Sequence, residues 1–122
     1  MERLFIETGQ FSETVDSDGG KDFLEIIQQE VLKNLELPIS KRDVIPGSGG
    51  FIKLRVPDAR SGKGKSGGWR IVYFDHPQLL VTFLILIYPK SMKENISKDQ
   101  LKALRTYSQE LKQWQPANLK RK

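Results

Sequence analysis

The order of apolar patterns in these 122 residues predicts a small α+β domain. A short strand comes first, an acidic helical region follows, and three strands precede a last helix. The last three strands are joined by connections of roughly a dozen and four residues, which favour antiparallel neighbours. We expect a small antiparallel sheet with N-terminal helices and a C-terminal helix, in one domain over residues 1–122 with a basic tail at 117–122.

The N-terminal third is predicted to hold the first strand and the helices. Residues 3–7 fit a short strand, and a short helical piece is expected around residues 10–15. Gly19-Gly20 then breaks the chain before a longer helix, which Pro38 ends. The buried stripe of that helix is expected at Phe23, Ile26, Ile27, Val31 and Leu35.

The rest of the chain is predicted to form three strands and a helix. Residues 46–50 are a turn cluster, and residues 51–56 alternate as a strand with Lys53 and Arg55 on one face. Residues 69–74 form the next strand, 75–78 a turn, and 79–88 an apolar central strand. A capping box at Ser97 and Gln100 opens the last helix. Its buried stripe is expected at Leu101, Leu104, Leu111 and Trp114, with Tyr107 nearby and Pro116 at its end.

Composition excludes several kinds of site. The chain has no Cys and one His, which excludes disulfides, thiol nucleophiles and metal sites built on thiolates or several imidazoles. We therefore expect no metal and no cofactor. His76 lies in a predicted turn and is expected to be a surface residue. The first ten residues lack the pattern of a signal peptide, and residues 79–88 are too short to span a bilayer, so a cytoplasmic location without membrane contact is expected.

Charge is divided unevenly along the chain. Residues 1–40 carry a net charge of −6, residues 41–75 +5 and residues 76–122 +6. This asymmetry favours a surface that faces a polyanion, although basic runs are often only solvated faces. Lys53, Arg55 and Arg70 fall on neighbouring strands, but the sequence leaves open whether Arg70 shares their face. An open face with these cations would suit a phosphodiester backbone, and an ordinary wet sheet face is the alternative.

Three segments carry a resemblance to a known family. They are D-V-I-P-G-S-G-G-F-I-K-L-R-V at 43–56, G-K-G-K-S-G-G-W-R-I-V-Y at 62–73 and L-I-Y-P-K at 86–90. Together they resemble the HigB-type toxins of the RelE/ParE toxin–antitoxin superfamily. The resemblance implies a fold like that of microbial ribonucleases and cleavage of mRNA on the 70S ribosome without a metal. The ribose 2′-hydroxyl would attack the adjacent phosphate, leaving a 2′,3′-cyclic phosphate and a 5′-hydroxyl.

The resemblance also implies site residues. Lys53 and Arg55 match the basic K-x-R strand, Arg70 matches the arginine of the following strand, and Lys90 matches the basic position after the last strand. Ser91 stands where related toxins have a second basic residue, so the phosphate clamp is weaker or rearranged. Other residues expected to contact RNA or the ribosome are Arg60, Lys63, Lys65 and Lys93.

The chemistry of the reaction assigns a role to Arg70 and leaves the general base open. Without a metal, Arg and Lys must meet the charge of the transition state, and the Arg70 guanidinium suits the phosphorane because it can bind two oxygens. The base stays open between Lys53, which crowding by other cations would favour as a neutral amine, and Tyr88. Tyr88 could instead bind the phosphate, stack on a base, or pack in the core. Trp69 and Tyr73 are expected in the core or packed on a sheet face.

Two other functions remain open at this stage. The same fold in ParE-type relatives poisons DNA gyrase, and a non-catalytic RNA- or ribosome-binding protein would need the same cations. The resemblance implies a cognate antitoxin, HigA-like with a helix-turn-helix domain, and contact with operator DNA only through that antitoxin. An acidic or amphipathic antitoxin segment would cover the basic face or block ribosome entry by bulk.

Overall fold

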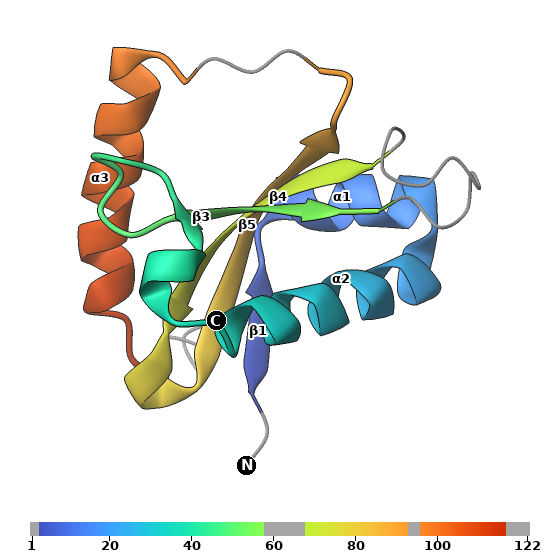
Figure 1. Ribbon diagram of the computed structural model, residues 1–122, viewed down its shortest axis with the longest axis horizontal. Helices are drawn as coiled ribbons and strands as arrows, with labels where there is room; N and C mark the ends of the chain where they lie inside the picture. Colours follow the sequence, from blue (N-terminus) through green and yellow to red (C-terminus); the bar gives the residue numbers. More distant parts are fainter. Residues whose placement is uncertain (1–2, 58–67, 93–95, 117–122) are drawn as a thin grey trace.

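The computed structural model describes residues 3–57, 68–92 and 96–116. Its strands are β1 (Leu4–Glu7), β2 (Asp43–Val44), β3 (Ile52–Val56), β4 (Trp69–His76) and β5 (Val81–Pro89). Its helices are α1 (Gly9–Asp18), α2 (Gly20–Leu35) and α3 (Lys98–Lys112), with 3₁₀ turns η1 (Ile39–Lys41) and η3 (Pro77–Leu79). Figure 1 shows α1 and α2 on one side of the sheet and α3 on the other. The predicted α+β fold class is confirmed.

The described strands form one sheet in the order β1-β5-β4-β3-β2. The pairs β3–β4 and β4–β5 are antiparallel, as expected, and β2, which was not predicted, pairs antiparallel with β3. β1 differs, because it runs parallel to β5, with Leu4 beside Val81 and Glu7 beside Leu84. The sheet is therefore mixed, and helices α1 and α2 begin the long connection that a parallel pair requires.

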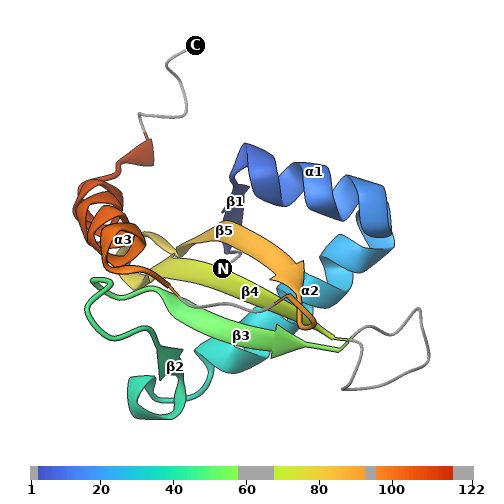
Figure 2. The same cartoon turned by 90° about the horizontal axis from the view of Figure 1, so that it is seen from above.

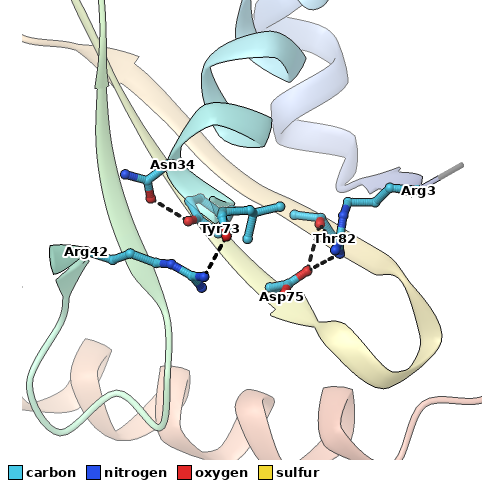
Figure 3. A network of polar contacts seen from close by, with 7 residues as sticks. Arg3, Asn34, Arg42, Tyr73, Asp75 and Thr82 are labelled. Carbon is cyan, nitrogen blue, oxygen red and sulfur yellow. Dashed lines mark hydrogen bonds and ion pairs between the residues drawn. The ribbon is translucent and has the colours of Figure 1, made fainter. Parts of the chain in front are cut away.

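Helices α1 and α2 form because each has a cap and an apolar stripe. The Thr8 hydroxyl accepts a hydrogen bond from the Phe11 N–H and caps α1, which is longer than the predicted piece. Gly19, at φ 156°, and Gly20, at φ 63°, turn the chain into α2. The Arg42 guanidinium donates to the carbonyls of the last α2 turn and its exit, at Leu35 and Leu37. This contact closes the C-terminal end of α2 (Figure 3).

Polar groups within the sheet are also paired with each other. The Tyr73 hydroxyl donates to Asn34 Oδ1 on α2, and burial raises the pKa of Tyr73 to about 12. Arg3 forms an ion pair with Asp75, which also accepts a hydrogen bond from Thr82 (Figure 3). β4 continues to His76, beyond the predicted strand end at residue 74, because Asp75 and His76 pair with β5.

A β-bulge interrupts the pairing of β4 with β5. Val72 lies opposite Leu86, but Tyr73 lies opposite Leu84, so Ile85 is the extra residue. Strict alternation from Val81, Phe83 and Ile85 would have placed position 87 on the α3 side. Because of the bulge, Ile87 packs with the α1 and α2 core instead, and Tyr88 packs on the α3 side.

Helix α3 is attached to the sheet along one flank by the 46–50 turn. The predicted capping box of Ser97 and Gln100 is present at its start. Arg105 Nε donates to the Gly47 carbonyl over 2.9 Å, and a Cβ at Gly49 would lie 2.1 Å from Ser108 Oγ. Figure 2 shows this turn beside α3. The helix ends at Lys112, before Pro116, and Trp114 packs on the sheet from beyond the helix.

Candidate functional site

The strand register decides the face on which Arg70 lies. Arg55 and Arg70 are direct partners across β3 and β4, and Lys53 is the partner of Val72. Direct partners point to the same face of a sheet. Arg70 therefore shares the α3-side face with Lys53 and Arg55, while its strand neighbours Trp69 and Ile71 pack into the α1 and α2 core.

These three cations surround a small polar cavity. A space of about 290 Å³ is lined by Asp43, Lys53, Arg55 and Arg70, and we call it the cation cavity. Arg55 is exposed, whereas Lys53 and Arg70 are half-buried. The Nη1 atom of Arg70 is buried and has no hydrogen-bond partner in the described part of the chain. Two arginines placed directly opposite one another repel, so a bound anion would relieve the cost of placing them there.

Asp43 is a residue of this cavity that sequence reasoning missed. It lies in β2, directly opposite Lys53. β2 is only two residues long, too short for a period-2 pattern to reveal it. Asp43 is the first residue of the first segment that carries the family resemblance. Its place in that segment was the one feature of the sequence that could have identified it as a site residue.

Tyr88 lies next to the cation cavity because of the bulge in β5. It is the direct partner of Arg70 across β4 and β5, so Arg55, Arg70 and Tyr88 form one row across three strands. The Tyr88 ring is half-buried and packs against the α3-side apolar cluster. Tyr88 therefore packs in the core, one of the roles considered for it, and at the same time lies beside Arg70.

Lys90 lies at the same end of the sheet, just beyond β5. Its backbone N–H donates to the Gly68 carbonyl over 2.8 Å, which ties the start of β4 to the end of β5. Lys90 does not line the cation cavity. The predicted contact residues Arg60, Lys63, Lys65 and Lys93 lie outside the described residues, as does the tail at 117–122.

Trp69 and Tyr73 are structural residues as expected, but His76 is not the surface turn residue that the sequence predicts. Trp69 and Tyr73 belong to the buried core. His76 ends β4, and its Nε2 lies 3.2 Å from the Lys112 carbonyl at the end of α3. His76 is half-buried there rather than a plain surface residue, and it is far along β4 from Arg70.

Among residues 3–57, 68–92 and 96–116, no group of three or more His, Cys, Asp or Glu side chains is placed to hold a metal ion. None of the helices in these ranges has the length and apolar character needed to cross a membrane.

Comparison with protein families identifies a family that the chain matches. A family model described as the RelE toxin of the RelE / RelB toxin-antitoxin system matches residues 40–122, which is more than half of the chain. The matched range contains the four residues of the cation cavity, Tyr88, Lys90 and all of α3. β1, α1 and α2 lie before it.

Proposed function

The chain belongs to the RelE family of toxins from toxin–antitoxin systems, and from this premise we propose that it is an endoribonuclease that cleaves mRNA on the ribosome. The observation that carries the proposal is the opposition of Arg55 and Arg70 beside Lys53, with a buried Arg70 nitrogen that lacks a partner among the described residues. A phosphodiester is the anion that such a row would accept. Because its substrate would be on the ribosome, we propose that the protein acts in the cytoplasm. We also propose that residues 1–122 form a single domain.

The proposed reaction needs only groups of this chain and the RNA. The ribose 2′-oxygen attacks the adjacent phosphorus as a base removes its proton, and the bond from phosphorus to the 5′-oxygen breaks. The 5′-oxygen takes up a proton, leaving a 2′,3′-cyclic phosphate and a 5′-hydroxyl. Arg70 would bind the phosphorane oxygens and Arg55 the flanking phosphate, because guanidinium groups stabilise charge that develops in the transition state.

Three groups near the cation cavity are candidates for the proton transfers. Tyr88 is the partner of Arg70 across β4 and β5, and Lys53 lies two residues from Arg55 along β3. Asp43 adds a carboxylate, a group that can act as a general base. We propose Asp43 as a third candidate for the base, and Lys90 as a phosphate contact outside the cavity.

Residue patterns support a more specific assignment within the family. We propose that the chain is a HigB-type toxin, because its P-G-S-G-G turn, K-L-R strand and W-R-I-V-Y strand resemble that group. The antitoxin would then be HigA-like with a helix-turn-helix domain, and operator DNA would be contacted only through it.

The deciding experiment maps new 5′-hydroxyl RNA ends after induction in growing bacteria. Wild type should generate ends inside translated frames. Arg70→Ala should reduce the cleavage rate on programmed ribosomes at least about 100-fold while ribosome binding changes less than about threefold. Lys21→Ala, an exposed cation on α2, is the matched control and should cleave like wild type.

Two outcomes would contradict the proposal. Equal losses of binding and cleavage in Arg70→Ala would remove the catalytic role of Arg70. Growth arrest without new RNA ends would favour gyrase poisoning or ribosome blockade, and a DNA supercoiling assay on purified gyrase would separate these two.

A further inference from the structure

Within residues 3–57, 68–92 and 96–116, one flank of α3 is left open. The 46–50 turn covers the opposite flank through Gly47 and Gly49. Along the open flank, facing β5 and the end of β1, lie two adjoining cavities of about 670 and 510 Å³. Tyr107 lines both of them, so they form one elongated depression, which we call the α3 groove.

The half of the groove near the end of β5 is apolar. Leu86, Met92, Ile96 and Leu104 line it. Leu86 is 37% exposed and Met92 58% exposed, so large apolar side chains face solvent from the floor and the rim. Contiguous exposed apolar surface in a soluble domain marks a place where another molecule binds.

The other half combines aromatic walls with carboxylates. Phe83 and Trp114 meet edge to face, with ring centroids 5.4 Å apart, and Glu7 and Glu110 also line this cavity. Glu7 Oε1 accepts a hydrogen bond from Ser12 Oγ over 2.7 Å. Within the described ranges, neither carboxylate forms an ion pair.

This second half suits a cationic side chain. The two carboxylates attract positive charge, and the C-terminal end of α3 adds the negative end of a helix dipole close to Glu110. Aromatic faces such as that of Trp114 also attract ammonium and guanidinium groups. A Lys or Arg side chain would therefore be bound here by charge and by the ring together.

We infer that the α3 groove binds an amphipathic segment of the antitoxin, with apolar side chains beside Leu86 and a Lys or Arg side chain between Glu7 and Glu110. The antitoxin follows from membership of the toxin family and does not depend on the proposed RNase activity. Tyr88 lines the apolar half of the groove and is the strand partner of Arg70. A segment bound in the groove therefore ends beside the cation cavity, where it limits access of RNA.

The test measures binding of the purified full-length cognate antitoxin by titration calorimetry. Glu110→Lys should raise Kd at least about tenfold, because it places a positive charge against the bound cation. Glu25→Lys, an exposed position on α2, changes the net charge equally and should stay within about twofold of wild type. Leu86→Ser should also weaken binding, which tests the apolar half separately.

A charge exchange identifies the contact directly. In the antitoxin, replacement of each Lys or Arg by Glu should yield one variant that binds wild-type toxin weakly and Glu110→Lys toxin with restored affinity. Circular dichroism of each toxin variant verifies its fold before titration. Wild-type affinity of Glu110→Lys, or equal weakening by Glu25→Lys, would overturn the inference.

Cleavage assays keep this inference distinct from the proposed activity. Glu110 lies outside the cation cavity, so Glu110→Lys toxin alone should cleave mRNA like wild type and should be less inhibited by added antitoxin. If the chain does not cleave RNA at all, the calorimetric comparison still decides whether the groove is the antitoxin site.

Discussion

Five arginines in the described residues divide into two groups by what their guanidinium groups contact. Arg3, Arg42 and Arg105 bind a carboxylate or backbone carbonyls and hold the fold together. Arg55 and Arg70 instead lie opposite one another at the cation cavity. The first group stabilises the protein without a ligand, whereas the second is stabilising only when an anion is bound.

Replacement of Arg55 should reveal this repulsion as a gain in stability. Arg55→Thr should raise the free energy of unfolding by about 0.5 kcal/mol in buffer of low ionic strength, because it removes a like-charge cross-strand pair. Urea unfolding measures the change. Arg55→Lys keeps the charge and should show no gain. Added phosphate should stabilise wild type more than Arg55→Thr, and an equal response of both proteins would contradict the repulsion.

The Tyr73 hydroxyl should make stability fall in alkaline solution. Burial raises the pKa of Tyr73 to about 12, partly offset by the charge of Arg42. Between pH 10 and 12 the unfolded phenol loses its proton while the folded one keeps it, so the free energy of unfolding decreases as pH rises. Wild type should lose about 1 kcal/mol more than Tyr73→Phe between about pH 9 and 11. Parallel pH profiles of the two proteins would refute this.

At the scale of elements, the glycine turn at 46–50 is a joint between the sheet and α3. Gly49, at φ +89°, lies so close to Ser108 that a side chain does not fit. β3 with Lys53 and Arg55 leaves this turn directly. The P-G-S-G-G motif, which is one part of the family resemblance, therefore positions the cation-bearing strand.

Gly49→Ala should destabilise the protein by about 2–4 kcal/mol, because the added methyl group clashes with Ser108 and the backbone angle is strained. Gly9→Ala is the matched control, since a Cβ at Gly9 meets nothing within 4 Å. It should leave stability unchanged or raise it by about 0.5 kcal/mol. Urea unfolding of both variants checks the difference, and similar midpoints would show that the turn tolerates a side chain.

Most elements were predictable because their patterns are local. The K-L-R alternation placed Lys53 and Arg55 on one face, and the capping box located the start of α3 correctly. β1 was predicted without a partner, because parallel pairing with β5 depends on contacts about 77 positions apart.

The site was less predictable than the fold for the same reason. The face of Arg70 required the register of β3 with β4, since its strand is apolar on both faces. The face on which Tyr88 lies depends on a bulge in β5. The run at 79–88 is apolar at nearly every position, so its sequence has no alternating pattern in which a bulge could be detected. Asp43 lies in a strand too short to have a pattern.

At the scale of the whole molecule, charge is separated across the sheet. Residues 1–40 carry a net charge of −6 and include β1, α1 and α2, while the cation cavity lies on the opposite face of the sheet from α1 and α2. Such a charge distribution orients an approaching polyanion toward the cation cavity and repels it from the helices.

Neutralising acidic residues of α1 and α2 should weaken this orientation. A variant with Asp16→Asn, Asp22→Asn and Glu25→Gln should bind non-specific single-stranded RNA several-fold more tightly at about 50 mM salt, with little difference at about 200 mM. Fluorescence anisotropy measures this binding. Its cleavage rate on programmed ribosomes should stay within about twofold of wild type. An unchanged RNA affinity at low salt would mean that the acidic helices do not steer RNA.

The parallel contact of β1 with β5 also has a consequence for the order of folding. β4 and β5 are joined by a short turn and can pair as soon as that turn closes. β1 is separated from β5 by most of the sequence, so these two strands pair only after distant parts of the chain have met. Arg70 and Tyr88 belong to the early hairpin, so part of the cation row is assembled while the outer edge of β5 is still uncovered. Until β1 pairs, that edge offers unsatisfied backbone groups to any other strand, and the late step thus separates a folded toxin from an aggregating chain.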